Sequence, residues 1–159
     1  MYSLEPKIID TSKRLFIGKR INMSLVDNKT GELWASFGPF IRSIPNRIGN
    51  DRFSLQVYDS TYFNHFNPKK EFTKWALVEV NSINETPKDL DSFMLPEGKY
   101  AVFSYTGLSS DTSVFQYIYS VWLPNSEWSL DDRPHFEVLG SAYKNDSADS
   151  EEEIWIPIK

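Results

Sequence analysis

The chain has 159 residues and a formal net charge of −5, and it contains no cysteine. This length fits one domain, or two small halves that share a core. The lack of cysteine excludes a disulfide framework and thiolate chemistry. The negative charge argues against a partner bound through its phosphate backbone, so we expect no direct binding of nucleic acid.

The first residues, Met1-Tyr-Ser-Leu-Glu-Pro, have neither the basic region nor the apolar region of a signal peptide. No apolar run approaches the ~20 residues needed to cross a bilayer. We therefore predict a cytoplasmic protein with no membrane partner. Aromatic residues make up 15% of the chain, which is more than a core requires, so some rings are predicted to line a cavity.

The first half of the chain predicts a strand, a helix and two more strands. The helix has apolar residues at helical spacing from Glu32, with a break expected at Gly38-Pro39. The later strands show alternation of apolar residues. The predicted elements are a strand over 7–24 with a polar interruption, a helix over 32–44, strands over 53–59 and 74–80, and a polar linker over 81–92.

The second half repeats this order. Its helix has apolar residues at i, i+3, i+4 and i+7 and is expected to stop at Pro124. The acidic run Glu151–Glu153 is expected to be a solvated surface. The predicted elements are a strand over 99–106, a helix from 111 or 112, a strand over 134–139, a polar loop over 141–152 and a strand over 154–158.

The order strand, helix, strand, strand thus occurs twice, at a separation of roughly eighty residues. Phe53 aligns with Phe136 and Trp75 with Trp155, which places Ser54 opposite Glu137. We predict an α+β fold with a duplicated strand–helix–strand–strand repeat, an antiparallel sheet, two helices on one face and a ligand cleft between the halves. The chain is predicted to form one domain over 1–159, with halves at about 1–85 and 93–159.

Alternation also predicts two different sheet faces. One face carries large rings together with acids, namely Tyr58, Trp75, Glu79, Glu137 and Trp155. Rings of this size are unusual under water and acids are expensive in a core, whereas a lined cavity accommodates both. The other face is predicted to carry the helices and consists of Phe53, Leu55, Val57, Ala76, Val78, Val80, Phe136, Val138, Ile154, Ile156 and Ile158.

Rings with a carboxylate favour an organic cation or a flat, polarisable ligand. A cation over a ring gains about 0.5–2 kcal/mol, and a carboxylate ~4 Å away adds about 4 kcal/mol before desolvation at an effective dielectric of ~20. A strand glutamate is also commonly exposed or paired with Lys or Arg, and a strand Trp commonly packs in a core. His65 and His135 have no partner at ligand spacing, and no phosphate-binding loop is present, so neither a metal nor a cofactor is expected.

Four blocks of the sequence resemble the GyrI-like effector-binding family, in its order and spacing: Leu95-Pro-Glu-Gly-Lys-Tyr-Ala-Val-Phe, Tyr119-Ser-Val-Trp-Leu-Pro-Asn-Ser, Pro134-His-Phe-Glu and Glu153-Ile-Trp-Ile-Pro-Ile. That family includes the ligand-sensing domains of AraC-type and MerR-type multidrug regulators. The resemblance implies a duplicated fold with a ligand cleft. It also implies that Glu137 is the buried acid that meets cationic ligands. The chain departs from the family pattern at Ser126-Glu127-Trp128, where Ser-Gly-Tyr is frequent.

Three functions follow from these observations and from the resemblance. The first is a stand-alone protein that binds amphipathic, cationic small molecules, for drug sensing or sequestration, and that is not an enzyme. The second is a hydrolase acting on electrophilic small molecules, with Glu137 as acid or base and Tyr58 as hydrogen-bond donor. The third is a protein-interaction module similar to gyrase inhibitors. The first strand begins at about residue 7, so we expect no helix-turn-helix and no DNA-binding regulator in this chain.

Overall fold

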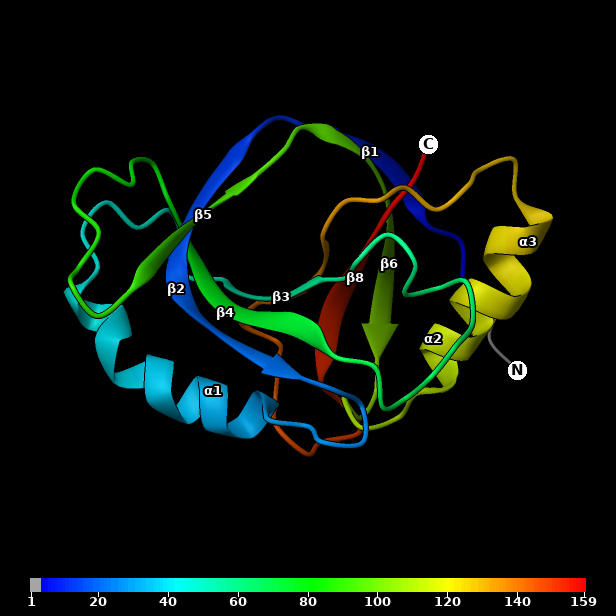
Figure 1. The fold of residues 1–159 in the computed structure, drawn as a ribbon, viewed down its shortest axis with the longest axis horizontal. Coiled ribbons are helices and arrows are strands. Elements are labelled where there is room, and N and C mark those ends of the chain that lie inside the picture. Colours follow the sequence, from blue (N-terminus) through cyan, green and yellow to red (C-terminus); the bar gives the residue numbers. More distant parts are fainter. Residues whose placement is uncertain (1–3) are drawn as a thin grey trace.

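The computed structural model describes residues 4–159, and within them eight strands form one antiparallel sheet (Figure 1). The strand order across the sheet is β1-β6-β8-β7-β3-β4-β2-β5. The α+β class and the duplicated architecture are therefore confirmed. The strands are β1 (Lys7–Thr11), β2 (Arg14–Met23), β3 (Arg52–Val57), β4 (Phe72–Val80), β5 (Asp91–Leu95), β6 (Gly98–Thr106), β7 (His135–Leu139) and β8 (Glu151–Pro157).

Two helical segments lie far apart at the two sides of the molecule (Figure 1). The first is α1 (Thr30–Phe37), which continues as a 3-10 helix over Gly38–Ser43, so the expected break at Gly38-Pro39 is present. The second is α2 (Ser113–Tyr117), followed by a π-helical turn over Ile118–Trp122 and α3 (Leu123–Asn125). Within residues 4–159, no helix is both long and apolar enough to cross a membrane.

Pro124 does not stop the second helix as predicted, because it lies inside α3, which ends at Asn125. Proline is tolerated in the first turn of a helical segment, where its missing N–H has no intrahelical partner. The wider turn at Ile118–Trp122 starts a new segment immediately before this proline, which provides such a position.

The duplication is visible in the register of the sheet. The order β6-β8-β7 on one side of the centre matches β2-β4-β3 on the other, so the β7–β3 pair lies at the centre. Ser54 pairs with Glu137 across this central pair, as the aligned halves predicted. The predicted alignment of Trp75 with Trp155 is wrong by two residues. Trp155 pairs with Phe136, whereas Phe53, the equivalent of Phe136, pairs with Leu77 and Trp75 pairs with Leu55.

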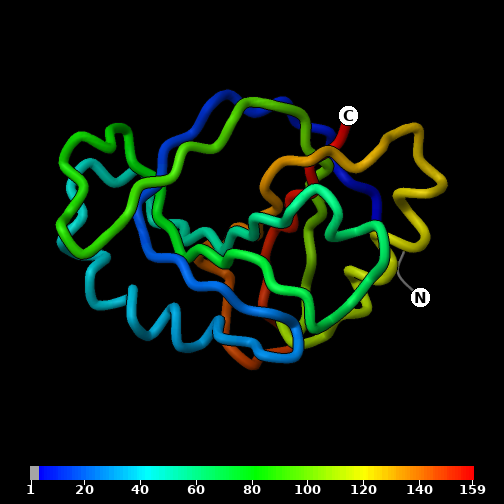
Figure 2. The backbone as a smooth tube through the Cα atoms, viewed as in Figure 1, coloured from blue at the N-terminus to red at the C-terminus, as the bar shows by residue number. Residues whose placement is uncertain are grey.

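The sheet is strongly curled. β1 and β2 are separated in the chain by only Ser12 and Lys13, yet β1 lies at one edge of the sheet and β2 near the other. β5 and β6 are joined by an equally short connection, yet β5 lies at one edge of the sheet and β6 near the other. The two pairs of strands form the arch over the sheet in Figures 1 and 2. One face of the sheet is therefore enclosed by the curl.

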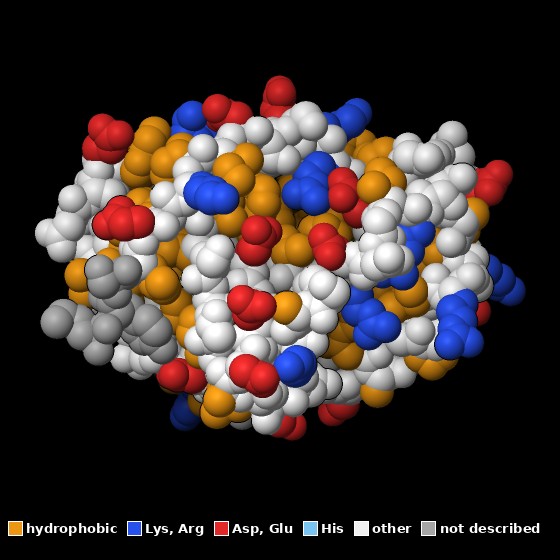
Figure 3. Space-filling model, turned by 180° about the vertical axis from the view of Figure 1, so that it is seen from behind, with side chains coloured by type: hydrophobic (Ala, Val, Ile, Leu, Met, Phe, Trp, Pro, Cys, Tyr) orange, Lys and Arg blue, Asp and Glu red, His pale blue; other side chains and the backbone are white. Residues whose placement is uncertain are grey.

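Both faces of the sheet are buried. On the helix face, α1 covers one apolar cluster on β2 and β4, and α2 with the following turn covers a second cluster on β6 and β8. The curled face holds a third cluster rich in rings. Seen from behind, hydrophobic side chains reach the surface in the upper middle of the molecule beside both acidic and basic groups (Figure 3).

The predicted division of residues between the faces is partly wrong. The central register pairs Phe53 with Leu77 and Leu55 with Trp75, so the apolar residues of β3 lie on the curled face together with the tryptophans. The same holds for Phe136 and Val138 on β7. Because both faces are buried, alternation alone did not determine which set of side chains faces the helices.

Three further predictions about the elements need correction. The segment over 7–24 is two strands that lie far apart in the sheet, not one. The polar linker over 81–92 ends in β5, which pairs with β2 and so covers its outer edge. The last strand begins at Glu151 rather than Ile154, because Glu151–Glu153 pair with β6. The acidic run is therefore part of the sheet.

Candidate functional site

A polar stripe crosses the helix face between the clusters covered by α1 and α2. Its side chains come from the central strands β3 and β7 and from β4, and most of them are nearly inaccessible to solvent. Polar groups in such positions are uncommon and require partners, so this stripe is the first candidate for a site. The buried members are Ser54, Gln56, Lys74 and His135, and they surround the partly exposed Glu137.

Glu137 lies in the middle of this stripe, and 15% of its side chain remains exposed. Its Oε1 accepts a hydrogen bond of 3.1 Å from Nε2 of Gln56. The Nζ atom of Lys74 lies 4.0 Å from the same oxygen. Burial raises the pKa of Glu137, and Lys74 and Gln56 oppose this effect. The acid is thus held by one amide and one distant ammonium.

A cluster of rings lies beside this acid and closes the site. Tyr58 is at its centre, with ring centroids 4.4 Å from Tyr62, 5.0 Å from Phe63 and 4.9 Å from His135. The Phe63 ring also stacks on His135 at 5.2 Å, and its centroid is 5.3 Å from that of Tyr119. The connection between β3 and β4, residues 58–71, supplies three of these rings and extends toward α2 (Figure 2).

The rings and the acid share one electrostatic environment. Burial raises the pKa of Tyr58, and the charges of Tyr119 and Glu137 raise it further. The pKa of Tyr119 is also raised, first by burial and then by Glu137. The Tyr119 hydroxyl lies 2.9 Å from Nδ1 of His135, whose pKa burial lowers to about 3. At neutral pH these phenols and this imidazole are therefore uncharged, and the cluster contributes ring surface rather than charge.

A second acid belongs to this environment. Glu152 is on β8, two residues before Ile154, which pairs with Glu137, so both acids are on the helix face. Burial and the charge of Glu137 raise the pKa of Glu152 to about 7, and Lys74 opposes them. The predicted solvated role of Glu151–Glu153 is therefore wrong for Glu152.

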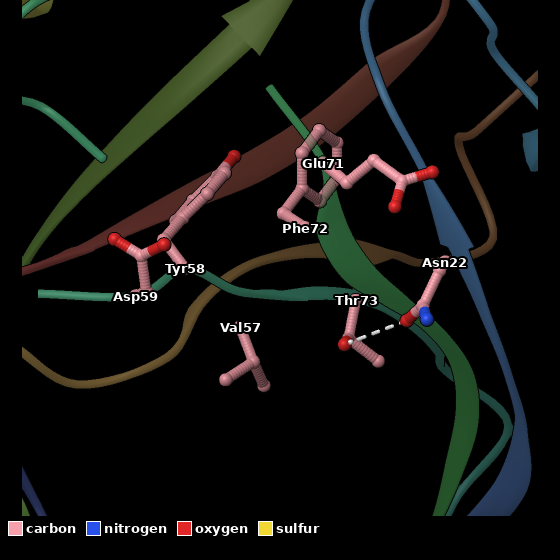
Figure 4. Close-up of a pocket in the computed structure, with 7 residues that line it drawn as sticks. All are labelled: Asn22, Val57, Tyr58, Asp59, Glu71, Phe72 and Thr73. Carbon is pink, nitrogen blue, oxygen red and sulfur yellow. Dashed lines mark hydrogen bonds between the residues drawn. The ribbon is translucent and has the colours of Figure 1, made fainter. Parts of the chain in front are cut away.

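Two hollows open on either side of the ring cluster. One has a volume of about 350 Å³ and is lined by residues of β2, β3, β4 and the β3–β4 connection, with the Tyr58 and Phe72 rings and two carboxylates around it (Figure 4). The other has about 220 Å³ and lies between the Tyr58–Asn64 segment and the segment from Leu130 to His135. Glu137 lines neither hollow.

The five predicted ligand-binding residues are divided between the two faces. Glu137 and Tyr58 come together on the helix face, where the charge of Glu137 acts on the Tyr58 hydroxyl. Trp75 and Trp155 are buried in the cluster of the curled face. Glu79 shares that face, where its carboxylate accepts two hydrogen bonds of 3.0 Å from Arg14. The expectation of one common face is therefore incorrect.

The Arg14–Glu79 pair explains why acids and rings occur together on the curled face. The Arg14 guanidinium lies within 5.1–5.9 Å of four ring centroids, those of Phe16, Phe53, Phe136 and Trp155. The side chains of Arg14 and Glu79 are only 19% and 18% exposed. The combination that predicted a ligand site is thus occupied there by a cation of the chain itself.

Sequence reasoning missed Lys74, Glu152, Tyr119 and His135. Tyr119 was interpreted as part of a helical core stripe, and His135 as an isolated residue. The signal for Lys74 was a charged residue within an otherwise apolar strand, on the same side as Ala76 and Val78. Across residues 4–159, no three His, Asp or Glu side chains are placed to hold a metal ion.

Solved structures with this fold cover nearly the whole chain. An integron cassette protein from Vibrio cholerae, VCH_CASS2, is 18% identical with a TM-score of 0.62, over 98% of this chain and 97% of that one. EcmrR, solved in a complex with DNA, is 12% identical with a TM-score of 0.74, over 98% of this chain and 57% of EcmrR. SAV2435 bound to tetraphenylphosphonium is 14% identical with a TM-score of 0.64, over 98% and 94%.

At these identities the likeness shows the fold. The comparison with curated proteins gave no match. A family model is more informative, since the model of the GyrI-like small molecule binding domain matches residues 4–159, which is the full length that the structure describes. The chain therefore belongs to the family of GyrI-like small-molecule binding domains.

Proposed function

We propose that this protein binds amphipathic organic cations beside Glu137, at a site that opens when the neighbouring rings move, and serves in sensing or sequestering them. The observation that carries the proposal is a carboxylate that is mostly buried, lies beside a ring cluster and, within residues 4–159, accepts only one short hydrogen bond, from Gln56. The family to which the chain belongs binds small molecules, and a protein of the same fold is known with a bound lipophilic cation.

The energies of such a site favour a cation over a neutral ligand. An ionised carboxylate ~4 Å from a cation contributes about 4 kcal/mol at an effective dielectric of ~20, before desolvation. Each ring face adds about 0.5–2 kcal/mol. The rings of Tyr58, Tyr119 and Phe63 supply such faces without fixed hydrogen-bond directions. We therefore propose selection by charge and ring contact, with broad tolerance of shape.

Ligand entry requires movement of the ring cluster. Glu137 lines neither hollow, and the half-exposed ring of Phe63 lies on the outside of the cluster at 38% exposure. This ring belongs to the β3–β4 connection rather than to a strand or helix, and segments of this kind move at low cost. Displacement of Phe63 would join the hollow beside it to the carboxylate.

Calorimetry with tetraphenylphosphonium tests the proposal. We expect binding to the wild-type protein and at least a tenfold loss with Glu137→Gln, which keeps the shape of the side chain and removes its charge. Glu85→Gln makes the same chemical change at an exposed position and should leave the affinity unchanged. Neutral triphenylphosphine oxide should bind more weakly than the cation and should not respond to Glu137→Gln. Equal effects of the two substitutions would contradict the proposal.

Hydrolysis of electrophilic small molecules is a second candidate. The raised pKa of Glu137 would suit a general acid or base, and Tyr58 places a protonated hydroxyl in the same environment. Incubation with an aryl epoxide, followed by measurement of the diol, distinguishes the two functions. Turnover that Glu137→Gln abolishes would favour the hydrolase; absence of turnover together with cation binding favours the binding protein.

A further inference from the structure

Lys74 is a lysine in the interior of a strand, where lysine is rarely found. It lies on β4, its side chain is 9% exposed, and it points to the helix face together with Ala76 and Val78. An ammonium loses much of its hydration in such a position and needs compensation from an opposite charge. Burial lowers the pKa of Lys74, while the charges of Glu137 and Glu152 raise it.

The partner of Lys74 does not hold it closely. Its Nζ lies 4.0 Å from Oε1 of Glu137, which is beyond hydrogen-bond distance, and that oxygen already accepts the amide of Gln56. Across residues 4–159, neither a hydrogen bond from Nζ nor one to Oε2 of Glu137 is formed. The ammonium therefore compensates the charge of the acid without occupying its second oxygen.

Another largely buried ion pair provides a contrast. On the curled face, Arg14 forms two hydrogen bonds of 3.0 Å with Glu79 and lies among four rings. That geometry is typical of a permanent, structural pair. The pair at Glu137 has a comparable acid and rings nearby, but its cation is a lysine on a flexible four-carbon stem and stands farther away. The Arg14–Glu79 pair is held by two hydrogen bonds, whereas the Lys74–Glu137 pair has none, so its cation can be displaced by another.

We propose that the Lys74 ammonium is the resident cation of the site, and that an organic cation binds by taking its place beside Glu137. The inference rests on the proposed function, since it describes how the same site accepts its ligand. Lys74 then determines which ligand charge the site prefers. With both acids ionised and Lys74 charged, the cluster of Lys74, Glu137 and Glu152 carries one net negative charge, which matches a ligand with a single positive charge.

Removing the charge of Lys74 and strengthening its contact with Glu137 should shift the affinity for an organic cation in opposite directions. Lys74→Met approximately keeps the length of the side chain and removes the competing charge, so tetraphenylphosphonium should bind at least tenfold more tightly at about pH 8, which is above the pKa of Glu152. Lys74→Arg should close the pair as Arg14 does and weaken binding at least tenfold. Triphenylphosphine oxide, which is neutral, should respond to neither change.

Lys88→Met is the matched control, because it removes the same charge from an exposed loop position. It should leave affinity within twofold of the wild type. Near-ultraviolet circular dichroism establishes that each variant is folded, and Lys74→Arg retains the buried charge if Lys74→Met does not fold. A folded variant of either kind with unchanged tetraphenylphosphonium affinity overturns the inference.

The two proposals fail in different ways. If the wild type binds tetraphenylphosphonium through Glu137 but the Lys74 variants bind it equally well, Lys74 is only a structural partner and the proposed function stands. If neither the wild type nor Lys74→Met binds any cation, the proposed function is wrong and the inference falls with it. Weaker binding by Lys74→Met would show that the ammonium supports the ligand instead of competing with it.

Discussion

The affinity for a permanently charged cation should rise as the pH is raised from about 5 to about 7.5, because Glu152 loses its proton in this range. The pKa of Glu152 is about 7, set by burial and by the charge of Glu137. Ionisation of Glu137 and loss of the proton from Lys74 act in the same direction, since each makes the site more negative. His135, with a pKa of about 3, stays neutral throughout.

The size of the effect follows from the sheet register. Ile154 pairs with Glu137, so Glu152 is its diagonal neighbour on the adjacent strand. Such neighbours are about 7–8 Å apart, and at an effective dielectric of ~20 a cation at Glu137 gains about 2 kcal/mol from ionised Glu152, or about thirtyfold in Kd. By linkage, binding lowers the pKa of Glu152 below its value of about 7 in the free protein, so affinity rises as the pH approaches 7, and the contribution of Glu152 is complete above about pH 8.

Calorimetric titration with tetraphenylphosphonium at several pH values and constant ionic strength measures this dependence, because the ligand itself does not titrate. Glu152→Gln should remove most of the rise. Glu151→Gln, the same change at the exposed neighbouring position, should preserve it. An identical pH profile for the wild type and Glu152→Gln would refute the assignment of Glu152 to the site.

Three other substitutions test the fold and the access to the site. Gly18→Ala should reduce the free energy of unfolding by about 3 kcal/mol or more, since its Cβ would overlap the backbone carbonyl oxygen of Ala76 on β4. Gly31→Ala meets nothing within 4 Å and should be tolerated, and urea unfolding compares the two variants. Arg14→Met should cost about 3 kcal/mol by leaving Glu79 unpaired, and the double replacement of both residues by Met should recover much of this loss in the same assay. Phe63→Ala should speed the association of tetraphenylphosphonium in stopped-flow fluorescence while lowering stability by about 1 kcal/mol; an unchanged rate would show that this ring does not limit entry.

Much of the fold could be predicted from periodicity. The repeated order of elements, the break at Gly38-Pro39 and the pairing of Ser54 with Glu137 depend on local spacing and on the alignment of the two halves, and the structure agrees with them. The strand β5 was missed because its residues, Asp91 to Leu95, alternate weakly and form a short edge strand. Edge strands bury little, so their sequences carry a weak signal.

The composition of the site was harder to predict, for a physical reason. Glu79 and Glu137 both stand between apolar residues on their strands, and from the sequence alone they look alike. Their roles differ because Arg14, which is 65 residues from Glu79 in the chain, reaches one of them and only Lys74 approaches the other. Which cation meets which acid depends on the strand order and register, because β2 pairs with β4 beside Glu79 and β3 lies between the strands of Lys74 and Glu137. This is a long-range property that no local pattern contains.

The central β7–β3 pair has a consequence for how charge is distributed about the pseudo-symmetry axis. Two identical halves would set the same residue against itself there, and two carboxylates facing each other at the axis would repel. The fused chain avoids this by letting the halves diverge, with Glu137 on one side and the small hydroxyl of Ser54 on the other. A duplicated chain can therefore place a single acid at a near-symmetric centre, whereas a dimer of identical units would place two there.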